Sequence, residues 1–264
     1  MKKRRLIPTL LYRNGNLVQS QEFKRFRNIG NPFKAVERFS DWDADELIYL
    51  DISSSEESNY LRSDLKNNFK GSVIELLSEV ARFATMPITF GGGIKNLQDV
   101  SDRIVHGADK VSLNNATFSN PNLVTDAVRE FGSQAIIASI DAYHLDGKLL
   151  AFNRSIGGAH SDFFEHIRLV QDLGVGEILL NSVNRDGMKC GYDIDLINKV
   201  VNLVNIPVIA IGGAGNWEDL DEVFEHTNVD AVSAANIFQW QEQSVDQARR
   251  LLFDRGHNIR PPLN

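Results

Sequence analysis

The chain alternates between short apolar runs and longer segments with helical spacing. Eight runs rich in β-forming residues begin at Leu6, Glu46, Pro87, Lys110, Ala135, Glu177, Pro207 and Ala231. Segments with apolar residues three and four positions apart follow these runs, for example Ser72 to Phe83, Phe163 to Leu173 and Ile197 to Val204. Strands that are apolar on both faces and alternate with helices are typical of a parallel sheet covered by helices.

The number of these units favours a closed barrel. Eight strand–helix units within 264 residues match the size of a (β/α)8 barrel, so we expect a single α/β domain spanning residues 1–264. An open, doubly wound sheet is the alternative with the same alternation of elements. The hydrophobic content of 42% is ample for a core of either kind.

Several patterns recur about 120 to 130 residues further along the chain, in the same order. The matching pairs are LIPTLLYRNG with IIASIDAYHLDG, ADELIYLDI with VGEILLNSV, MPITFGGGI with IPVIAIGGAG, and GADKVSLNNATF with NVDAVSAANIF. Chance similarity among parallel strands would produce one such match, but hardly four. The repeat predicts two half-barrels, of about residues 1–132 and 133–264, in which each strand is equivalent to the one four places later.

Charge and composition narrow the class of protein. The net charge of −7 is spread along the chain, and only the KKRR run at residues 2–5 is densely basic, so we expect no nucleic-acid partner. The apolar run after KKRR is broken by Arg13, which argues against a secretory signal. No apolar run reaches the roughly 18 residues needed to cross a bilayer, so we expect no membrane association.

The cysteine and histidine content adds two further expectations. Cys190 is the single cysteine, which excludes an internal disulfide and, with the preceding points, favours a cytoplasmic protein. We interpret Cys190 as a free thiol without a role. The six histidines show no spacing typical of metal ligands, so we expect neither a metal nor a cofactor.

Two glycine-rich loops, Gly91–Gly93 and Gly212–Gly215, follow predicted strands where barrel active sites form. Glycines allow close approach of a ligand, and amides near a helix start attract anions, although tight turns alone would also need glycine. Each loop is followed one strand later by a small polar turn, NNA or AAN, which favours two phosphate sites. The predicted binding residues are Gly92, Gly93, Asn114, Asn115, Asp186, Gly187, Gly212, Gly213 and Asn236.

Carboxylates stand at the predicted mouth of the barrel. Asp141 ends the fifth strand, and a carboxylate flanked by apolar residues can have a raised pKa and act as an acid or base. We therefore predict that Asp141 is catalytic. For Asp51 and Asp186 a functional role and simple hydrogen bonding to loop amides remain equally open. The position equivalent to Asp141 in the first half is Leu11.

Four charged residues stand at strand starts, on the opposite face. Arg5, Glu46, Lys110 and Glu177 begin the first, second, fourth and sixth strands, so two cations and two anions would converge on the barrel axis. They would form either a salt-bridged plug or a gate for something that enters from this face.

Taken together, these motifs carry a resemblance that covers essentially the whole chain. They are ADELIYLDI, GGGI at 91–94, GADKVSLN, FGSQAIIASIDA, GEILLNSVNRDGMKCGYD and IGGAG. The chain resembles the cyclase subunit of imidazole glycerol phosphate synthase, the HisF family of histidine biosynthesis. The resemblance implies a substrate with a phosphate at each end and a glutaminase partner on the N-terminal face of the barrel. Ammonia would enter through the charged layer, so Arg5, Glu46, Lys110 and Glu177 match the family's ammonia gate.

The departures from the family pattern fall at the mouth. The family ends its first strand with an aspartate that acts with the one matching Asp141, and here that position is Leu11, which cannot move a proton. Gln19 replaces the lysine usual in a mobile loop after that strand. Asn181 replaces a threonine, and Asn184 replaces the first aspartate of the usual DRDG.

The segments RRLIPTLLYRNGNLVQSQEF and RNIGNP are similar to a divergent branch of the family associated with surface-polysaccharide (lipopolysaccharide) genes. This resemblance implies that ammonia converts an acetamido group on a sugar into an acetamidino group. The amide oxygen must first be activated, usually with ATP, and the chain has no GxxxxGK[ST] loop, so a third, ATP-using partner is implied. The substrate would be a phosphorylated small molecule or a nucleotide sugar. The alternatives are a genuine histidine-pathway cyclase and a non-catalytic ammonia conduit or scaffold.

Overall fold

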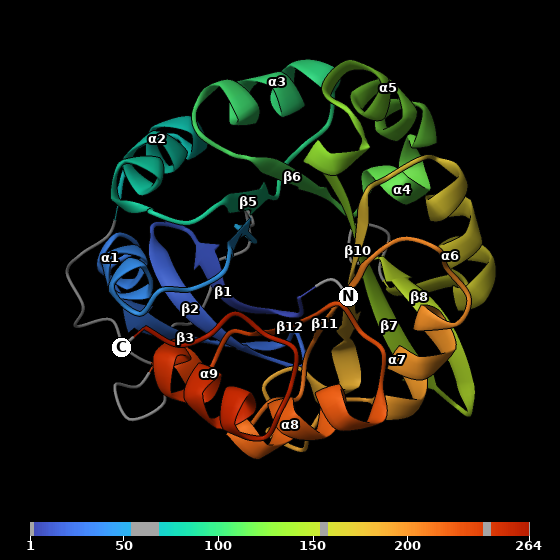
Figure 1. Ribbon diagram of the computed structural model, residues 1–264. Coiled ribbons are helices and arrows are strands. Elements are labelled where there is room, and N and C mark those ends of the chain that lie inside the picture. The colour runs from blue at the N-terminus through green and yellow to red at the C-terminus, as the bar shows by residue number, and fades with distance from the viewer. Residues whose placement is uncertain (1–2, 54–68, 154–157, 240–243, 264) are drawn as a thin grey trace.

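Eight parallel strands form a closed barrel in the computed structural model, which describes residues 3–53, 69–153, 158–239 and 244–263. The strands are β1 (Arg5–Arg13), β4 (Leu47–Asp51), β5 (Ile88–Gly91), β6 (Lys110–Leu113), β7 (Ile136–Leu145), β10 (Glu177–Ser182), β11 (Val208–Ile211) and β12 (Ala231–Ala234). Each strand pairs in parallel with the next, and β12 returns to β1 (Figure 1). The (β/α)8 barrel is confirmed, and the open doubly wound sheet is excluded.

Helices surround this barrel on the outside (Figure 1). They are α1 (Lys34–Asp41), α2 (Val73–Phe83), α3 (Leu97–Val105), α5 (Pro121–Phe131), α6 (Phe163–Asp172), α7 (Ile194–Val201), α8 (Trp217–His226) and α9 (Val245–Asp254), with a short turn, α4 (Ala116–Ser119), before α5. The predicted helices are confirmed, although α7 begins and ends three residues earlier than expected. None of the helices among the described residues is long and apolar enough to span a membrane.

Helix starts are well specified by the sequence. Before α2, the Glu75 amide donates a hydrogen bond to Ser72 Oγ, and the Ser72 amide donates one to the Glu75 carboxylate. These two bonds form a capping box. Asn96 before α3 and Asn216 before α8 form the same motif. The equivalent caps of α3 and α8 agree with the division into two half-barrels, which stays a prediction.

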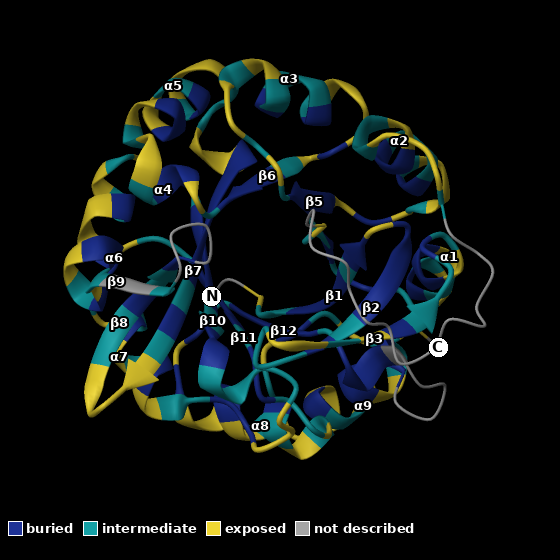
Figure 2. Cartoon of the chain, turned by 180° about the vertical axis from the view of Figure 1, so that it is seen from behind, coloured by how far each residue is buried: buried dark blue, intermediate teal, exposed yellow. Residues whose placement is uncertain are grey.

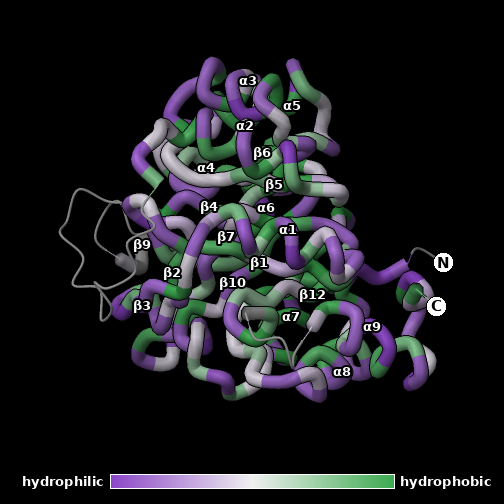
Figure 3. Tube along the Cα trace, turned by 90° about the vertical axis from the view of Figure 1, so that its left-hand side faces the viewer, coloured by the Kyte–Doolittle hydropathy of each residue, from purple (hydrophilic) through white to green (hydrophobic). Residues whose placement is uncertain are grey.

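Two antiparallel hairpins extend the barrel at the carboxyl ends of its strands, and the sequence analysis did not predict them. β2 (Asn16–Gln21) and β3 (Arg25–Gly30) follow β1, while β8 (Lys148–Asn153) and β9 (Gly158–Asp162) follow β7. The tight turns contain Asn14–Gly15, with φ of 45° and 92°, and Asp146–Gly147, with φ of 49° and 75°. Asn-Gly and Asp-Gly suit such turns because both central residues need positive φ. β2, β3 and β9 lie at one end of the molecule and both termini at the other (Figure 3).

The apolar core has two parts. One lies between the sheet and the helices, so that the strands are mostly buried and the helices are exposed on their outer sides (Figure 2). The other lies inside the barrel, where Ile7, Ile48, Ile137, Leu179, Ile209 and Ala231 form a separate cluster of buried side chains. This inner cluster is an apolar layer across the barrel axis, between the two strand ends.

Candidate functional site

A cavity of about 680 Å³ opens at the carboxyl ends of the barrel strands, and we call it the mouth cavity. Its volume lies within the range of small-molecule binding sites. The structure brings together around it every residue predicted for catalysis or phosphate binding. These are Gly92, Gly93, Asn114, Asn115, Asp141, Asp186, Gly187, Gly212, Gly213 and Asn236. The roles of these residues remain predictions, whereas their convergence is a geometric fact.

Asp141 ends the barrel part of β7 and is held by two neutral amides. Asn181 Nδ2 donates to its Oδ1 at 3.1 Å, and Asn114 Nδ2 donates to its Oδ2 at 2.9 Å. Burial raises the pKa of Asp141 from 3.8 to about 7, although both hydrogen bonds act to lower it; the charge of Asp186 adds to the increase. A carboxyl group with a pKa near neutrality can both donate and accept a proton at physiological pH.

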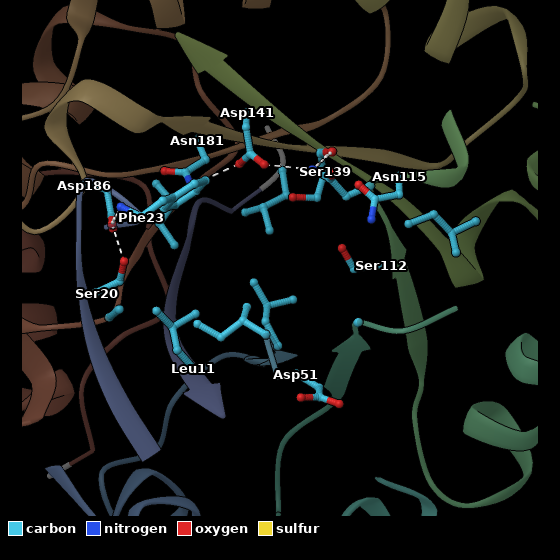
Figure 4. Close-up of a pocket in the computed structure, with 18 of the residues that line it drawn as sticks. Leu11, Ser20, Phe23, Asp51, Ser112, Asn115, Ser139, Asp141, Asn181 and Asp186 are labelled. Carbon is cyan, nitrogen blue, oxygen red and sulfur yellow. Dashed lines mark hydrogen bonds between the residues drawn. The ribbon is translucent and has the colours of Figure 1, made fainter. Parts of the chain in front are cut away.

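Leu11 occupies the opposite side of the mouth cavity from Asp141 (Figure 4). The strand order explains this, since β1 and β7 are four places apart in a ring of eight. Asn181 of β10 is the residue that binds Asp141 Oδ1. Leu11 and Asn181 are the two departures from the family pattern that the resemblance implies closest to this carboxylate, and that they are departures stays a prediction.

The hairpin β2–β3 is fixed over one side of the cavity by Asp186. The Asp186 carboxylate accepts from Ser20 Oγ at 2.6 Å and from the Phe23 amide at 3.3 Å, and its carbonyl accepts from the Glu22 amide at 2.9 Å. Burial raises the pKa of Asp186, while the bonds from Ser20 and Phe23 lower it. Asp186 therefore lines the cavity, and its carboxylate is hydrogen-bonded to groups of the hairpin loop. Hydrogen bonding to loop amides was one of the two roles left open for it by the sequence.

Asp51 and the glycine loops also make close structural contacts. Asp51 Oδ1 accepts a hydrogen bond from the Ser53 amide at 2.9 Å. A Cβ atom on Gly92 would lie 2.0 Å from the Asp51 carbonyl oxygen, and one on Gly213 would lie 2.0 Å from the Gly191 carbonyl oxygen. Gly92 and Gly213, both with positive φ, are therefore required by loop packing, whether or not a phosphate binds there.

The mouth cavity also has an apolar wall that was not predicted from the sequence. Phe23 and Phe26 of the hairpin line it beside Leu11 and Leu50. The Arg13 guanidinium lies 4.1 Å from the centre of the Phe26 ring, and Arg13 is almost fully buried, so this ring is held in place. The Asn-Gly turn after β1 could have indicated this wall in the sequence, because such a turn predicts that the following segment folds back as a hairpin.

At the other end of the barrel, the four predicted gate residues form a closed ionic ring. Arg5 contacts Glu46 at 2.6 Å and Glu177 at 2.8 Å, and Lys110 contacts Glu46 at 2.9 Å and Glu177 at 3.0 Å. Each member has two partners of opposite charge. Burial acts to raise the pKa of Glu177, but Arg5 and Lys110 outweigh it and lower this pKa below its ordinary value. The ionic ring and the inner apolar cluster lie in sequence along the axis towards the mouth cavity.

Outside these regions the described residues offer little further chemistry. They contain no group of three or more histidine, cysteine or carboxylate side chains that would hold a metal ion. Cys190 is exposed in the loop after β10, and its thiol is not in a disulfide. The predictions of no metal and no cofactor stay predictions.

Comparisons with known proteins place the chain in a family. Residues 5–244 match the family model "Histidine biosynthesis protein". The chain is 35% identical over 276 residues to the imidazole glycerol phosphate synthase subunit HisF of Nitrosopumilus maritimus, with 98% of this chain and 100% of that protein covered. It is 36% identical over 263 residues to the HisF subunit of Staphylococcus aureus strain bovine RF122, with the same coverage. The chain therefore belongs to the histidine biosynthesis protein family and is a HisF-like barrel.

Proposed function

We propose that this protein is an ammonia-using HisF-type subunit that works with a glutaminase and uses Asp141 as its acid–base group. The observation that carries the proposal is the arrangement along one axis. The ionic ring stands at the N-terminal face, the inner apolar cluster follows it, and the mouth cavity with Asp141 stands at the far end. This order is expected if a small molecule enters from a partner at the N-terminal face and reacts in the mouth cavity.

The inner layer supports ammonia rather than ammonium as the species that passes. Ile7, Ile48 and Ile137 are fully buried aliphatic side chains of this layer. An ammonium ion in an apolar layer would lose its hydration at a cost of several kcal/mol, whereas neutral ammonia carries no such charge. The ionic ring would then act as the gate through which neutral ammonia released by the glutaminase enters.

The reaction we favour differs from ring closure by a typical HisF subunit. Leu11 stands where the resemblance implies a second aspartate acting with Asp141, so Asp141 would transfer protons without that partner. We propose that the substrate is an acetamido sugar, carried by a phosphate or a nucleotide and used in surface-polysaccharide synthesis. A separate ATP-using partner would activate the amide oxygen. Ammonia would then attack the carbonyl carbon, the activated oxygen would leave with its phosphoryl or nucleotidyl group, and Asp141 would take the surplus proton, which leaves an acetamidino group.

Formation of imidazole glycerol phosphate is the second candidate, favoured by full-length similarity to two HisF subunits. The deciding assay supplies the histidine-pathway bisphosphate substrate and excess ammonium salt to the purified protein, so that no partner is needed. We expect no turnover in a folded protein. Turnover similar to that of the Staphylococcus aureus HisF subunit, measured in parallel, would contradict the proposal and establish the histidine reaction.

The conduit alternative is tested through Asp141. In a reconstituted mixture of this protein, the glutaminase and the ATP-using partner, Asp141→Asn should abolish amidination. Unchanged product formation would show that the barrel only conducts ammonia. Absence of binding to any glutaminase encoded beside its gene would exclude the partnership itself.

A further inference from the structure

A second, smaller cavity lies beside the mouth cavity, between the hairpins that follow β1 and β7, and we call it the hairpin pocket. Its volume is about 120 Å³, and it is lined by the β2–β3 turn, by β7 and β8, and by the loop after β10. We propose that the hairpin pocket binds the base of a pyrimidine nucleotide that carries the sugar. This inference rests on the proposed sugar substrate and chooses between its two carriers, a nucleotide rather than a phosphate alone.

Phe23 connects the hairpin pocket with the reaction site. Its side chain lines both the hairpin pocket and the mouth cavity. In the close-up it lies beside Asp186, whose carboxylate accepts a hydrogen bond from the Phe23 amide at 3.3 Å (Figure 4). The two cavities therefore border the same side chain, and a ligand whose reacting end lies in the mouth cavity can place its other end in the hairpin pocket.

The turn that carries Phe23 has an unfavourable backbone for its residues. Glu22 and Phe23 have φ of 48° and 57°, and the Lys24 amide donates to the Gln21 carbonyl at 3.0 Å. Glycine, asparagine and aspartate tolerate this left-handed region, whereas a bulky aromatic residue is strained there. Strain of this kind is found at ligand-binding sites, where the surrounding structure holds it. The bond to Asp186 holds the turn, so the strained conformation fixes the Phe23 ring between the two cavities.

Two further aromatic rings complete the wall of the hairpin pocket. The Phe152 ring lies 6.2 Å from the Phe23 ring, with 62° between their planes, and the Tyr143 ring lies 5.5 Å from that of Phe152, at 64°. All three side chains are only half-buried, so part of each ring remains uncovered. Aromatic rings bind planar bases by stacking and by edge-to-face contacts, and this binding is a common way to hold a nucleotide.

The hairpin pocket also offers polar groups to a base. Asn184 Oδ1 accepts from the His144 amide at 2.7 Å, and Asn184 Nδ2 donates to the His144 carbonyl at 3.1 Å. A carboxamide has two N–H groups and two lone pairs, so these bonds leave one donor and one acceptor for a ligand. Lys24 and Glu22 stand at the rim, 3.8 Å apart and largely exposed. Such groups fit the carbonyl and ring N–H groups of a base better than a purely apolar group.

The size of the hairpin pocket favours a single ring. A water molecule takes up about 30 Å³ in the liquid, so a volume of about 120 Å³ has room for about four waters. This room is enough for one six-membered ring with its oxygen substituents, whereas the fused rings of a purine need more. A pyrimidine base therefore fits better than a purine base.

The test is calorimetric binding of three probes to the whole chain, namely uridine monophosphate, adenosine monophosphate and ribose 5-phosphate, which has no base. We expect uridine monophosphate to bind about tenfold more tightly than ribose 5-phosphate, because only the nucleotide stacks on the aromatic wall. Adenosine monophosphate should bind more weakly than uridine monophosphate. In NMR spectra, uridine monophosphate but not ribose 5-phosphate should shift the backbone amides of Tyr143, Phe152 and Asn184.

Phe152 offers the cleanest variant because its side chain lines the hairpin pocket and not the mouth cavity. Phe152→Ala should weaken binding of uridine monophosphate about tenfold and leave that of ribose 5-phosphate unchanged, whereas Phe152→Tyr, which keeps the ring, should retain most of the affinity. Phe253→Ala, which removes an exposed ring from α9, is the matched control and should change neither affinity.

Equal affinities for uridine monophosphate and ribose 5-phosphate, without amide shifts at the hairpin pocket, would overturn the inference and leave a sugar phosphate as the proposed substrate. Tighter binding of adenosine monophosphate than of uridine monophosphate would overturn the assignment of a single-ring base. The proposed function fails by a separate result, turnover of the histidine-pathway bisphosphate, in an assay that contains none of these probes.

Discussion

The ionic ring and the mouth cavity stand at opposite ends of one barrel, and they hold their charged groups in different ways. From the resemblance to the HisF family we expect all four ring positions to keep the family's residue types and Leu11, Gln19, Asn181 and Asn184 to depart from them, and this stays a prediction. In the ring each charge is neutralised by two neighbours, so that a single change leaves partners unpaired. At the mouth, Asp141 is bound by neutral amides and faces open space. Pairing of charges therefore constrains the ionic ring more tightly than the surroundings of Asp141.

The largest expected effect at the mouth cavity is that of Asp141→Asn on product formation. The variant keeps the shape of the side chain but cannot transfer a proton, so we expect product formation with ammonium salt to fall by about 10²-fold or more. The assay is product formation in the reconstituted pathway. Asp51→Asn serves as the control, since Asp51 binds a loop amide, and it should have a smaller effect. Equal losses in both variants would contradict the assignment of Asp141 as the principal acid–base group.

The ionic ring should show its effect in stability. Glu177→Gln removes one carboxylate from both Arg5 and Lys110, and we expect the free energy of unfolding in urea to fall by about 3 kcal/mol at pH 7.5. Glu79→Gln, which breaks an exposed pair with Arg82, should cost less than about 1 kcal/mol.

The pH dependence of the ring variant follows from the lowered pKa of Glu177. A carboxylate with a lowered folded-state pKa contributes stability above its unfolded value of 4.5, and this contribution is lost as the pH falls through the folded value. The difference between the wild type and Glu177→Gln should therefore shrink below pH 4.5. A difference that persists in strong acid would mean that charge pairing is not its origin.

The difference between Leu11 and an aspartate at the same position can be tested by a gain of function. Leu11→Asp places a second carboxylate across the cavity from Asp141, and we expect formation of imidazole glycerol phosphate from ammonium to rise about tenfold above the wild-type background. Leu11→Asn has similar size and polarity but no titratable proton, and it should remain at background. A rise in both variants would show that the polarity of the site, rather than proton transfer, limits the reaction.

The smallest expected effect concerns Asp141 and stability. Its folded pKa of about 7 exceeds the ordinary 3.8, so bound protons stabilise the fold fully below pH 3.8 and this stabilisation is lost as the pH rises through 7. Relative to Asp141→Asn, the wild type should lose about 1 kcal/mol of unfolding free energy between pH 6 and 8. Parallel urea titrations at these pH values measure it. A constant difference would mean that Asp141 is already ionised at pH 6.

The barrel itself was predictable because its signals are local and repeated. Alternating strands and helices, and the capping residues Ser72, Asn96 and Asn216, each specify one element, and the count of units specifies closure. The site residues were found for a related reason, since the carboxyl ends of parallel strands must meet at one mouth. The positions of Asp141 and of both glycine-rich loops followed from strand position alone.

What remained hidden depended on contacts between distant segments. The bonds from Ser20 and Phe23 to Asp186 join residues more than 160 positions apart, and no local pattern indicates them. Arg103 was not singled out in the sequence, because its burial behind Gly92 depends on how α3 packs against the loop. The two hairpins do not depend on such distant contacts. The Asn14–Gly15 and Asp146–Gly147 turns are local sequence signals for them that were not used.

The closure of the barrel also has a consequence for the nascent chain on the ribosome. The start of β1 pairs with β12, with Arg5 opposite Ala231 and Pro8 opposite Ala234. Synthesis at 5–20 residues per second separates Arg5 from Ala231 by roughly 11–45 s, and during this time that edge of the first strand has no partner. Proline and a charged side chain on a strand edge resist pairing with other chains. We therefore expect Pro8 and Arg5 to disfavour pairing of this strand edge with other chains until β12 has been synthesised.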